Sequence, residues 1–227
     1  MIPKAFHFVW IGSKPPWWAV RNMDRFRYLN PEFTFHLHGE EVLLKAFEHA
    51  YSRIEGPHLY ARRSDLLRVS ALLRYGGGWY FDCDFLPIRP MKELYEANRD
   101  FPLGCFVTHC DYLRGRPWMA NGIIGTTAQS PFFALFVAGL VYRGDCTEVL
   151  GWDTYGPGLM TPLVEEHRSL VQVGELDGFY RLTDRKKSMK AYRKIANADY
   201  SRKAMVRELG EPLPFMMHMG MQDQLEL

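Results

Sequence analysis

Two aspartates one residue apart, Asp82 and Asp84, directly follow the apolar aromatic run Trp79–Phe81. Side chains alternate between faces in an extended chain, so this spacing predicts both carboxylates on one side and Cys83 on the other. Two neighbouring carboxylates form a hard, oxygen-rich site that suits Mg²⁺ or Mn²⁺, and such an ion takes its remaining ligands from phosphates and water. The pair therefore indicates a metal-assisted phosphate site, although this spacing is also common by chance.

A helix followed by a strand is expected to position these aspartates. Leu66, Val69 and Leu73 recur at helical spacing. The three glycines Gly76–Gly78 predict the end of that helix, because glycine adopts the left-handed closing conformation without a Cβ clash. The aromatic run after them is typical of a buried strand. Its carboxyl end is where open α/β sheets bind their ligands.

This stretch resembles the DXD sugar-binding region of glycosyltransferase family 32. Ala61–Arg68 and Gly76–Asp84 match the family pattern at the expected separation. The family includes capsular-polysaccharide sugar transferases and yeast mannosyltransferases, and the catalytic domains of large clostridial glucosylating toxins are related to it. The resemblance implies an α/β domain of the GT-A type, with a Rossmann-like mixed sheet flanked by helices. It also implies a nucleotide-sugar donor, a divalent cation and retention of anomeric configuration.

The resemblance implies roles for four residues near the motif. Asp84 is expected to bind the metal directly, and Asp82 to bind sugar or ribose hydroxyls and the metal, partly through water. Asp65 and Arg68 lie three residues apart and therefore share a helix face. Through the family they contact hydroxyls of the donor sugar. If the resemblance is set aside, Asp65 and Arg68 would be read as a surface ion pair that stabilises the fold by only about 0.5 kcal/mol.

Trp10 belongs to a second matching segment. The family often opens with I-P-K-x-x-H-x-x-W-I-G, and Ile2–Lys4 and His7–Gly12 fit this pattern in register. In the toxin relatives the equivalent tryptophan stacks on the nucleotide base, so Trp10 is expected in the donor site, where a flat ring offers a face to any base. The alternative is that Trp10 belongs to the hydrophobic core.

Two later residues also resemble family positions. Asn121 is expected to hydrogen-bond the donor sugar, although an asparagine before glycine is also a common turn signal. His218 resembles the histidine that completes the metal site with Asp82 and Asp84, and imidazole suits Mn²⁺. The family's tryptophan after this histidine is absent. His36 and His38 share a strand face without a visible third ligand, and we interpret them as surface residues.

The order of the expected elements is typical of an α/β protein. Strands alternate with helices, which points to a parallel sheet in the first part of a Rossmann-like domain. A single domain is expected over 1–227, with 1–126 binding the nucleotide sugar and 127–227 forming the acceptor side. Strands are expected over 5–11, 33–37 and 103–109, and helices over 17–29, 40–51, 91–98, 131–142 and 157–167.

Composition limits the class of protein. The 227 residues are 47% hydrophobic and 24% charged with a net charge of +2, as in an ordinary soluble domain, and they do not indicate nucleic-acid binding. There is no apolar run of about 18 residues, and the first residues are expected to enter a strand rather than to form a leader with a cleavage site. Four cysteines (Cys83, Cys105, Cys110 and Cys146) show no metal-type pairing. A reducing cytoplasm is the expected location, and within it the protein could also lie at the inner membrane surface.

Residues 184–208 hold nine Lys and Arg against three Asp and Glu. Such a run is usually a solvated helix face. It also suits a lid over a diphosphate, or a contact with anionic lipid or a lipid-linked acceptor.

The hypothesis that unites these patterns is a metal-dependent glycosyltransferase. It would use Mn²⁺ or Mg²⁺ and transfer a sugar from a UDP- or GDP-linked donor, with UDP favoured, to a hydroxyl of a glycan, lipid-linked or protein acceptor, as in polysaccharide biosynthesis. A phosphohydrolase with a nucleophilic first aspartate is one alternative. Such motifs continue with small residues and threonine, whereas Phe85–Leu86 follows here. A non-catalytic protein that binds sugar nucleotides is the other alternative.

Overall fold

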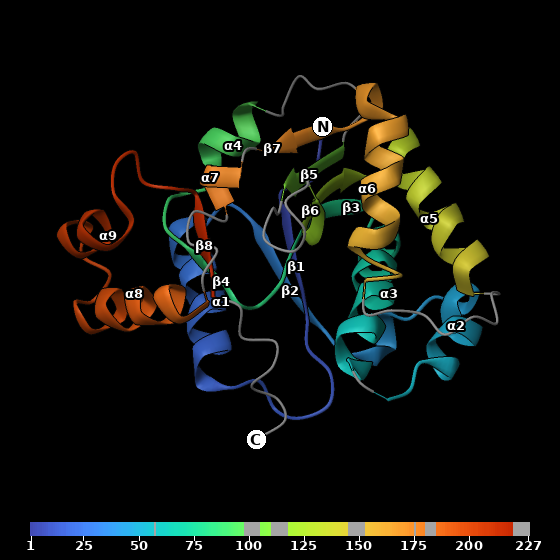
Figure 1. Ribbon diagram of the computed structural model, residues 1–227, viewed down its shortest axis with the longest axis horizontal. Helices are drawn as coiled ribbons and strands as arrows, with labels where there is room; N and C mark the ends of the chain where they lie inside the picture. Colours follow the sequence, from blue (N-terminus) through green and yellow to red (C-terminus); the bar gives the residue numbers. More distant parts are fainter. Residues whose placement is uncertain are drawn as a thin grey trace.

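A mixed β-sheet forms the centre of the molecule (Figure 1). The computed structural model describes residues 1–56, 58–97, 105–109, 118–144, 153–174, 176–179 and 185–219. Within these residues the main sheet has six strands in the order β2-β1-β3-β6-β5-β7. They are β1 (Ala5–Val9), β2 (Thr34–His38), β3 (Gly77–Phe81), β5 (Cys105–His109), β6 (Met119–Thr127) and β7 (Gln172–Gly174).

Strand direction divides this sheet. β1 runs parallel to β2 and β3, as the alternation of strands and helices predicted, and β7 runs parallel to β5. β6 is antiparallel to both of its neighbours, β3 and β5. The carboxyl ends of β1 and β3 therefore lie at the same edge, where the segments after Val9 and Phe81 leave the sheet. The expected mixed α/β sheet is confirmed.

Helices cover both faces of the sheet (Figure 1). On one side lie α3 (Leu59–Arg74), α5 (Pro131–Gly144) and α6 (Pro157–Glu166), and on the other α1 (Trp17–Leu29) with α8 (Arg185–Asn197) and α9 (Arg202–Leu209) outside it. β3 alternates between the two hydrophobic cores, since Trp79 and Phe81 pack toward α1 and Tyr80 packs toward α3. The strand is therefore buried on both faces, which explains its aromatic run. None of the described helices is long and apolar enough to cross a membrane.

A second, two-stranded sheet lies beside the motif. β4 (Phe85–Pro87) pairs antiparallel with β8 (Met216–His218), which places His218 opposite Phe85. The remaining short elements are α2 (Glu48–Arg53), α4 (Lys92–Ala97), α7 (Leu176–Phe179) and the 3₁₀ turns η1 (Glu40–Val42), η2 (Lys45–Phe47) and η3 (Arg168–Leu170). This pairing brings the late part of the chain to the DXD segment.

The predicted helix over 40–51 is wrong. The segment forms η1 and η2, joined by the extended residues Leu43 and Leu44, before the short α2 begins. Val42 and Phe47 are both buried. Five residues apart, they would point in different directions from a continuous helix, and the break allows both to reach the core. The other predicted helices and strands within the described residues are present with shifted ends. Residue 98 of the predicted helix over 91–98, and residues 103 and 104 of the predicted strand, lie outside the described residues.

The three glycines Gly76–Gly78, which follow α3 and begin β3, each have a positive φ angle. Gly76 (φ +77°) follows the helix end in open space. At Gly77 (φ +104°) a Cβ atom would lie 2.4 Å from the Thr126 carbonyl oxygen, and at Gly78 (φ +131°) it would lie 2.6 Å from Nε2 of His7. The glycines therefore end the helix, as predicted, and also allow neighbouring strands to approach.

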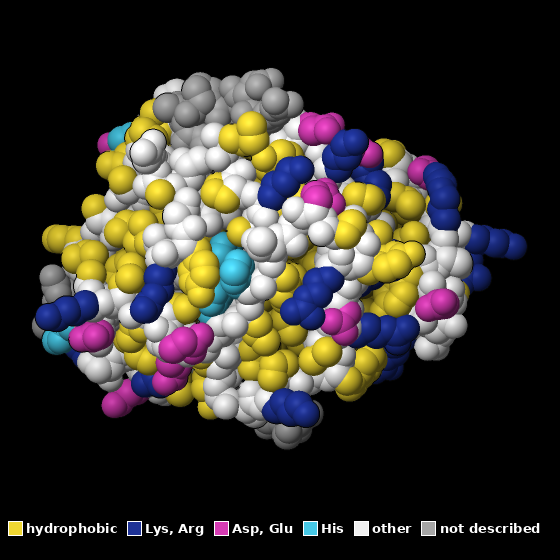
Figure 2. Space-filling view, turned by 180° about the vertical axis from the view of Figure 1, so that it is seen from behind, with side chains coloured by type: hydrophobic (Ala, Val, Ile, Leu, Met, Phe, Trp, Pro, Cys, Tyr) yellow, Lys and Arg dark blue, Asp and Glu magenta, His cyan; other side chains and the backbone are white. Residues whose placement is uncertain are grey.

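The interpretation as surface residues is wrong for His38, whereas His36 is half-buried. Their rings stack with His7 at centroid distances of 5.1 and 5.3 Å, and Tyr75 lies against all three. His38 is only 3% exposed, because His7 and Tyr75 cover this face of the edge strand β2. Histidine side chains are visible near the middle of the face in Figure 2. We refer to His7, His36 and His38 as the histidine stack.

Hydrogen bonds fix the proton positions in the histidine stack. His7 Nε2 lies 3.2 Å from the Gly77 carbonyl oxygen, which can only accept, so this nitrogen donates. His7 Nδ1 then accepts from His38 Nε2 at 3.0 Å. Burial and the neighbouring imidazoles lower the pKa of His7 to about 3 and that of His38 to about 4, and burial also lowers the pKa of His36. The stack is therefore built from neutral rings.

Candidate active site

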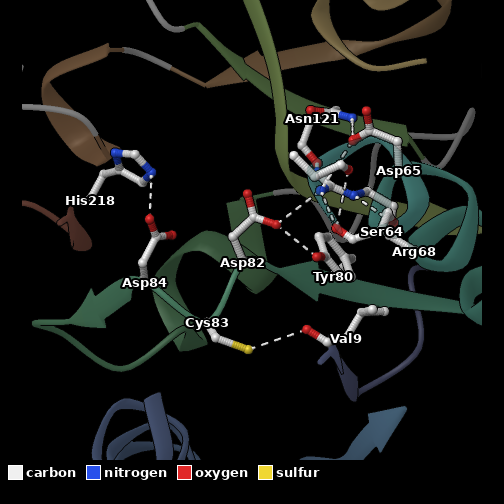
Figure 3. Close-up of polar contacts among 11 residues, drawn as sticks. Val9, Ser64, Asp65, Arg68, Tyr80, Asp82, Cys83, Asp84, Asn121 and His218 are labelled. Carbon is white, nitrogen blue, oxygen red and sulfur yellow. Dashed lines mark hydrogen bonds and ion pairs between the residues drawn. The ribbon is translucent and has the colours of Figure 1, made fainter. Parts of the chain in front are cut away.

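A buried guanidinium joins the predicted donor-site residues (Figure 3). Arg68 Nη2 lies 3.1 Å from Asp65 Oδ1 and 3.2 Å from Asp82 Oδ1. Arg68 Nη1 donates to the backbone carbonyl of Asn121 at 2.6 Å, and the Asn121 amide donates to Asp65 Oδ1 at 2.7 Å. The side chains of Arg68, Asp65 and Asp82 are 4, 7 and 15% exposed. Four residues predicted from the sequence thus form one network between α3, β6 and the turn after β3.

Two members of this network were not predicted. The Tyr80 hydroxyl donates to Asp82 Oδ1 at 2.7 Å, and the Arg68 guanidinium lies 4.7 Å from the Tyr80 ring centroid. Ser64 accepts from Arg68 at its carbonyl (3.3 Å) and at its hydroxyl (3.4 Å). The sequence contained a signal for both, since Tyr80 precedes Asp82 by two residues in a strand and Ser64 precedes Arg68 by four in a helix.

Asn121 does not form a turn. It lies inside the nine-residue strand β6, and the next residue, Gly122, accepts a hydrogen bond from the Asp82 amide at 2.8 Å. A Cβ atom at Gly122 would lie 2.7 Å from Asp82 Oδ2. The glycine therefore leaves space for the first carboxylate of the motif, and the turn interpretation of this Asn-Gly pair is wrong.

The two aspartates of the motif point away from Cys83, as the spacing predicted (Figure 3). Cys83 Sγ donates to the Val9 carbonyl at 3.6 Å, which ties the motif to the end of β1. Asp82 and Asp84 nevertheless have different partners. Asp82 contacts Arg68, whereas Asp84 Oδ2 lies 3.2 Å from His218 Nε2. The site therefore has a guanidinium side and an imidazole side.

Burial and neighbouring charges shift the pKa of several groups here. Burial raises the pKa of Asp65 to about 6, although Arg68 and the Asn121 amide oppose the shift. Burial also raises the pKa of Asp82, against the effect of Arg68, and Asp84 raises it further. Burial alone would lower the pKa of His218, but the Asp84 carboxylate and its hydrogen bond raise it above the ordinary value.

The Asp84–His218 pair offers donor atoms of the right chemistry for Mg²⁺ or Mn²⁺. No group of three His, Cys, Asp or Glu side chains arranged to hold a metal ion occurs in the part of the chain that the structure describes. Asp82, the third predicted ligand, is turned toward Arg68. These cations need only one or two protein carboxylates when a phosphate ligand supplies further oxygens. The residues therefore fit such an ion together with a bound diphosphate.

Trp10 leaves the sheet at the edge that carries the motif. Its backbone amide donates to the His38 carbonyl at 2.9 Å, and its indole N–H donates to the Ser13 carbonyl at 2.7 Å. The indole is half-buried and meets Trp18 edge to face at 5.9 Å. Val9, the preceding residue, contacts Cys83. Trp10 therefore directly follows the strand residue that contacts the motif, and its ring packs on the α1 side of the sheet with Cys83.

The loop before α6 packs on Asn121. A Cβ atom at Gly156 would lie 2.7 Å from the Asn121 amide nitrogen. Arg143, at the end of α5, donates to the carbonyls of Thr154 at 2.6 Å and Gly158 at 3.2 Å, which holds this loop in place. Pro157 begins the helix, as predicted.

Comparisons with known proteins find similarity to glycosyltransferases. Residues 11–100 match the family model described as a glycosyltransferase sugar-binding region containing a DXD motif, which covers less than half of the chain. This range includes Asp65, Arg68 and both aspartates, and it excludes Trp10, Asn121 and His218. No curated protein matches the chain.

Solved structures of glycosyltransferases share the fold. The PaToxG glycosyltransferase is 18% identical, with a TM-score of 0.53 over 93% of this chain and 79% of that chain. A glycosyltransferase involved in the glycosylation of the major capsid of PBCV-1 is 12% identical, with a TM-score of 0.53 over 98% and 96%. Mouse xyloside xylosyltransferase 1 is 15% identical, with a TM-score of 0.50 over 94% and 84%. The chain therefore has the α/β fold of GT-A glycosyltransferases, as predicted.

Proposed function

We propose that this protein is a metal-dependent glycosyltransferase. It transfers a sugar from a nucleotide-linked donor, with UDP favoured over GDP, to a hydroxyl acceptor, and it retains the anomeric configuration. One observation carries the proposal. The Asp65–Arg68–Asp82–Asn121 network and the Asp84–His218 pair meet at one edge of a GT-A sheet. An edge at the carboxyl ends of parallel strands is the usual ligand site of such sheets.

The protein network positions the donor sugar. Arg68 contacts both Asp65 and Asp82, and the Asn121 amide contacts Asp65, so the acceptor oxygens of the two carboxylates are held in fixed places. Carboxylate oxygens held in place lower the entropic barrier to the transfer reaction, because a sugar hydroxyl that hydrogen-bonds to them is already oriented. Asp82, the more exposed of the two carboxylates, contacts sugar or ribose hydroxyls, and Trp10 stacks on the base.

Asp84 and His218 would hold the cation, and Asp82 would reach it partly through water. The chemistry supplied there is Lewis-acid stabilisation of the negative charge that develops on the departing diphosphate. The acceptor is a hydroxyl of a glycan, a lipid-linked sugar or a protein. Residues 1–126 bind the donor in this proposal, and residues 127–227 form the acceptor side and contribute His218 to the cation site.

Turnover of nucleotide sugars tests the proposal. The protein with Mn²⁺ should release nucleoside diphosphate from at least one of a panel of UDP- and GDP-sugars, and chelation of the metal should stop the release. Asp84→Asn should lower the rate about 100-fold or more, because the direct metal ligand is lost. Asp24→Asn is the matched control, since Asp24 is exposed and pairs only with Arg27 among the described residues.

The products distinguish the alternatives. Inorganic phosphate instead of nucleoside diphosphate would show a phosphohydrolase. Binding of the nucleotide sugar without any product would show a non-catalytic binding protein. Metal-independent release, or full activity of Asp84→Asn, would contradict the proposed role of the motif.

A further inference from the structure

Positive charge is concentrated in one part of the chain. Residues 184–208 carry nine Lys and Arg against three Asp and Glu, a net +6. The whole chain has 28 against 26, so the rest has 19 against 23, a net −4. Within this segment the structure describes 185–208, which form α8 and most of α9 at one end of the molecule, outside α1 (Figure 1). The protein therefore has a basic end and a more acidic body.

The two helices are amphipathic. Tyr192 and Ile195 of α8, and Met205 and Leu209 of α9, are buried in the hydrophobic core that also contains α1. The opposite faces carry exposed cations: Lys190 and Arg193 on α8, and Arg202, Lys203 and Arg207 on α9. The buried faces fix the helices on the protein, so the charged faces form one surface. We call these cations, with Trp17 and Val20 of α1, the basic face.

Large apolar side chains lie beside these cations. Trp17 is 66% exposed and Val20 is 41% exposed, both on the outer side of α1. The Trp17 ring lies 6.4 Å from the Tyr192 ring of α8, and Arg21 lies over the Tyr200 ring at 4.8 Å. Figure 2 shows Lys and Arg side chains interspersed with hydrophobic ones on the side where these helices lie.

Acidic side chains do not neutralise the centre of the basic face. Glu208 is held by Lys194 at 2.9 Å and by Arg207 at 2.9 Å, and Glu211 pairs with Arg202. Among the residues that the structure describes, no acidic side chain lies within ion-pair distance of Lys190, Arg193 or Lys203. Their charges therefore face solvent.

We propose that the basic face binds the surface of a membrane that contains anionic phospholipids. Its cations contact the headgroup phosphates and carboxylates, and Trp17 and Val20 enter the boundary between headgroups and acyl chains. Tryptophan beside lysine and arginine is the typical composition of protein surfaces at this boundary. A nucleic acid would use the cations, but it offers no apolar environment to Val20. The membrane therefore accounts for both kinds of side chain.

Binding to lipid vesicles tests this proposal without any measurement of turnover. It can therefore fail while the transferase proposal stands, and the reverse also holds. The full chain should co-sediment with phosphatidylcholine vesicles that contain about one-third phosphatidylserine, and much less with pure phosphatidylcholine. Higher salt should weaken the binding, because exposed charges are screened. Equal binding to both kinds of vesicle would overturn the proposal.

Charge reversal identifies the surface. Lys190→Glu with Arg193→Glu should weaken binding at least about 30-fold, and Lys203→Glu on the other helix at least about fivefold, since each basic residue near an anionic surface contributes about 1 kcal/mol. The matched control is Lys45→Glu with Arg53→Glu, which makes the same change of charge at exposed sites of η2 and α2. An equal loss in this control would overturn the assignment.

Two further measurements separate lipid from other anions. Trp17→Ala should weaken binding to the anionic vesicles and leave the circular dichroism spectrum unchanged, because the ring is mostly exposed. Binding to duplex DNA or to polyglutamate as tight as to the vesicles at the same salt would show a general anion-binding surface and overturn the lipid assignment.

Discussion

Arg68 is the residue on which the candidate site depends most. Its guanidinium lies between two buried carboxylates and also donates to the backbone of β6. Burial of a carboxylate is unfavourable unless a cation or several hydrogen bonds stabilise it. One side chain thus stabilises Asp65 and Asp82 together and fixes the distance between helix α3 and the motif.

Removal of this cation should destabilise the fold. Arg68→Met should lower the free energy of unfolding by about 3–5 kcal/mol, because two buried carboxylates lose their charged partner. Urea unfolding followed by circular dichroism measures the effect. Arg27→Met, which breaks an exposed pair with Asp24 and a contact with the Phe35 ring, should change it by only about 1 kcal/mol. Equal stability of Arg68→Met and the wild type would show that Arg68 does not stabilise the site.

The family resemblance predicted the residues of the site better than it predicted their partners. Asp65, Arg68, Asp82 and Asn121 were expected in one donor site, and the structure brings them together, while their roles remain predictions. Tyr80 was missed because it was interpreted only as part of a buried strand. The spacing of Asp82 and Asp84 shows that their side chains share a side, but it does not show which side chains from other elements they contact. Their different partners were therefore not predictable.

At the scale of elements, the glycines that follow α3 and begin β3 set the position of the motif. Gly77→Ala should destabilise the protein more than Gly76→Ala. Both changes place a side chain at a positive φ angle, which costs about 1 kcal/mol, but only at Gly77 would the new Cβ meet the Thr126 carbonyl. Thermal unfolding of the two variants measures the difference. Equal melting temperatures would show that the strands can separate at this point without cost.

The histidine stack should make stability depend on pH. Its pKa values in the folded protein are lowered below the ordinary 6.5, so the unfolded chain binds more protons at acidic pH. The stabilisation is then complete above pH 6.5 and is lost as pH falls toward about 4 and about 3. The nearest other groups are the Tyr75 ring and Glu41, and Glu41 weakly raises the pKa of His38.

A double substitution tests this dependence. In the variant His36→Gln with His38→Gln, the loss of His38 should flatten the loss of stability between pH 6.5 and 4 by up to about 1.4 kcal/mol per pH unit, and the loss of His36 should flatten it further. The free energy of unfolding in urea at several pH values gives the slope. His49→Gln, at an exposed site on α2, is the control. An unchanged slope in the double variant would contradict the assignment to the stack.

The elements near the motif were predictable because their patterns are strong. α3 has an apolar stripe and a glycine end, and α1 ends before Asn30–Pro31. The helix predicted over 40–51 failed because tertiary packing of Val42 and Phe47 broke a pattern that looks helical locally. His38 was misassigned because His7 and Tyr75 cover this face of the edge strand, and the sequence of the strand does not show which residues will cover it.

At the scale of the whole molecule, a bound donor should stabilise the fold. UDP or GDP with Mn²⁺ at about 100 times its dissociation constant adds about 2.7 kcal/mol, which raises the melting temperature of a chain of this size by about 5–10 °C. Mn²⁺ without nucleotide should raise it less. Trp10→Ala should reduce the shift with nucleotide. The absence of a shift with any nucleotide would leave the donor site without support.

The mixed sheet and its GT-A arrangement were predictable only through the family resemblance. The alternation of strands and helices indicates the parallel part, β2-β1-β3, but no local pattern shows that β6 inserts antiparallel beside β3. The pairing of β4 with β8 joins segments that are far apart in the sequence. The local sequence of neither strand shows that the chain closes a loop of this length to pair them.

That pairing has a consequence for the order in which the protein is made. His218 lies 134 residues after Asp84 (218 minus 84), so a ribosome that adds about 5–20 residues per second needs about 7 to 27 s to synthesise the intervening chain. During this interval β1 and β3 can already form, while the imidazole side of the site is missing. A nascent chain of this protein should therefore acquire the Arg68 network first and its complete cation site only when synthesis is nearly finished.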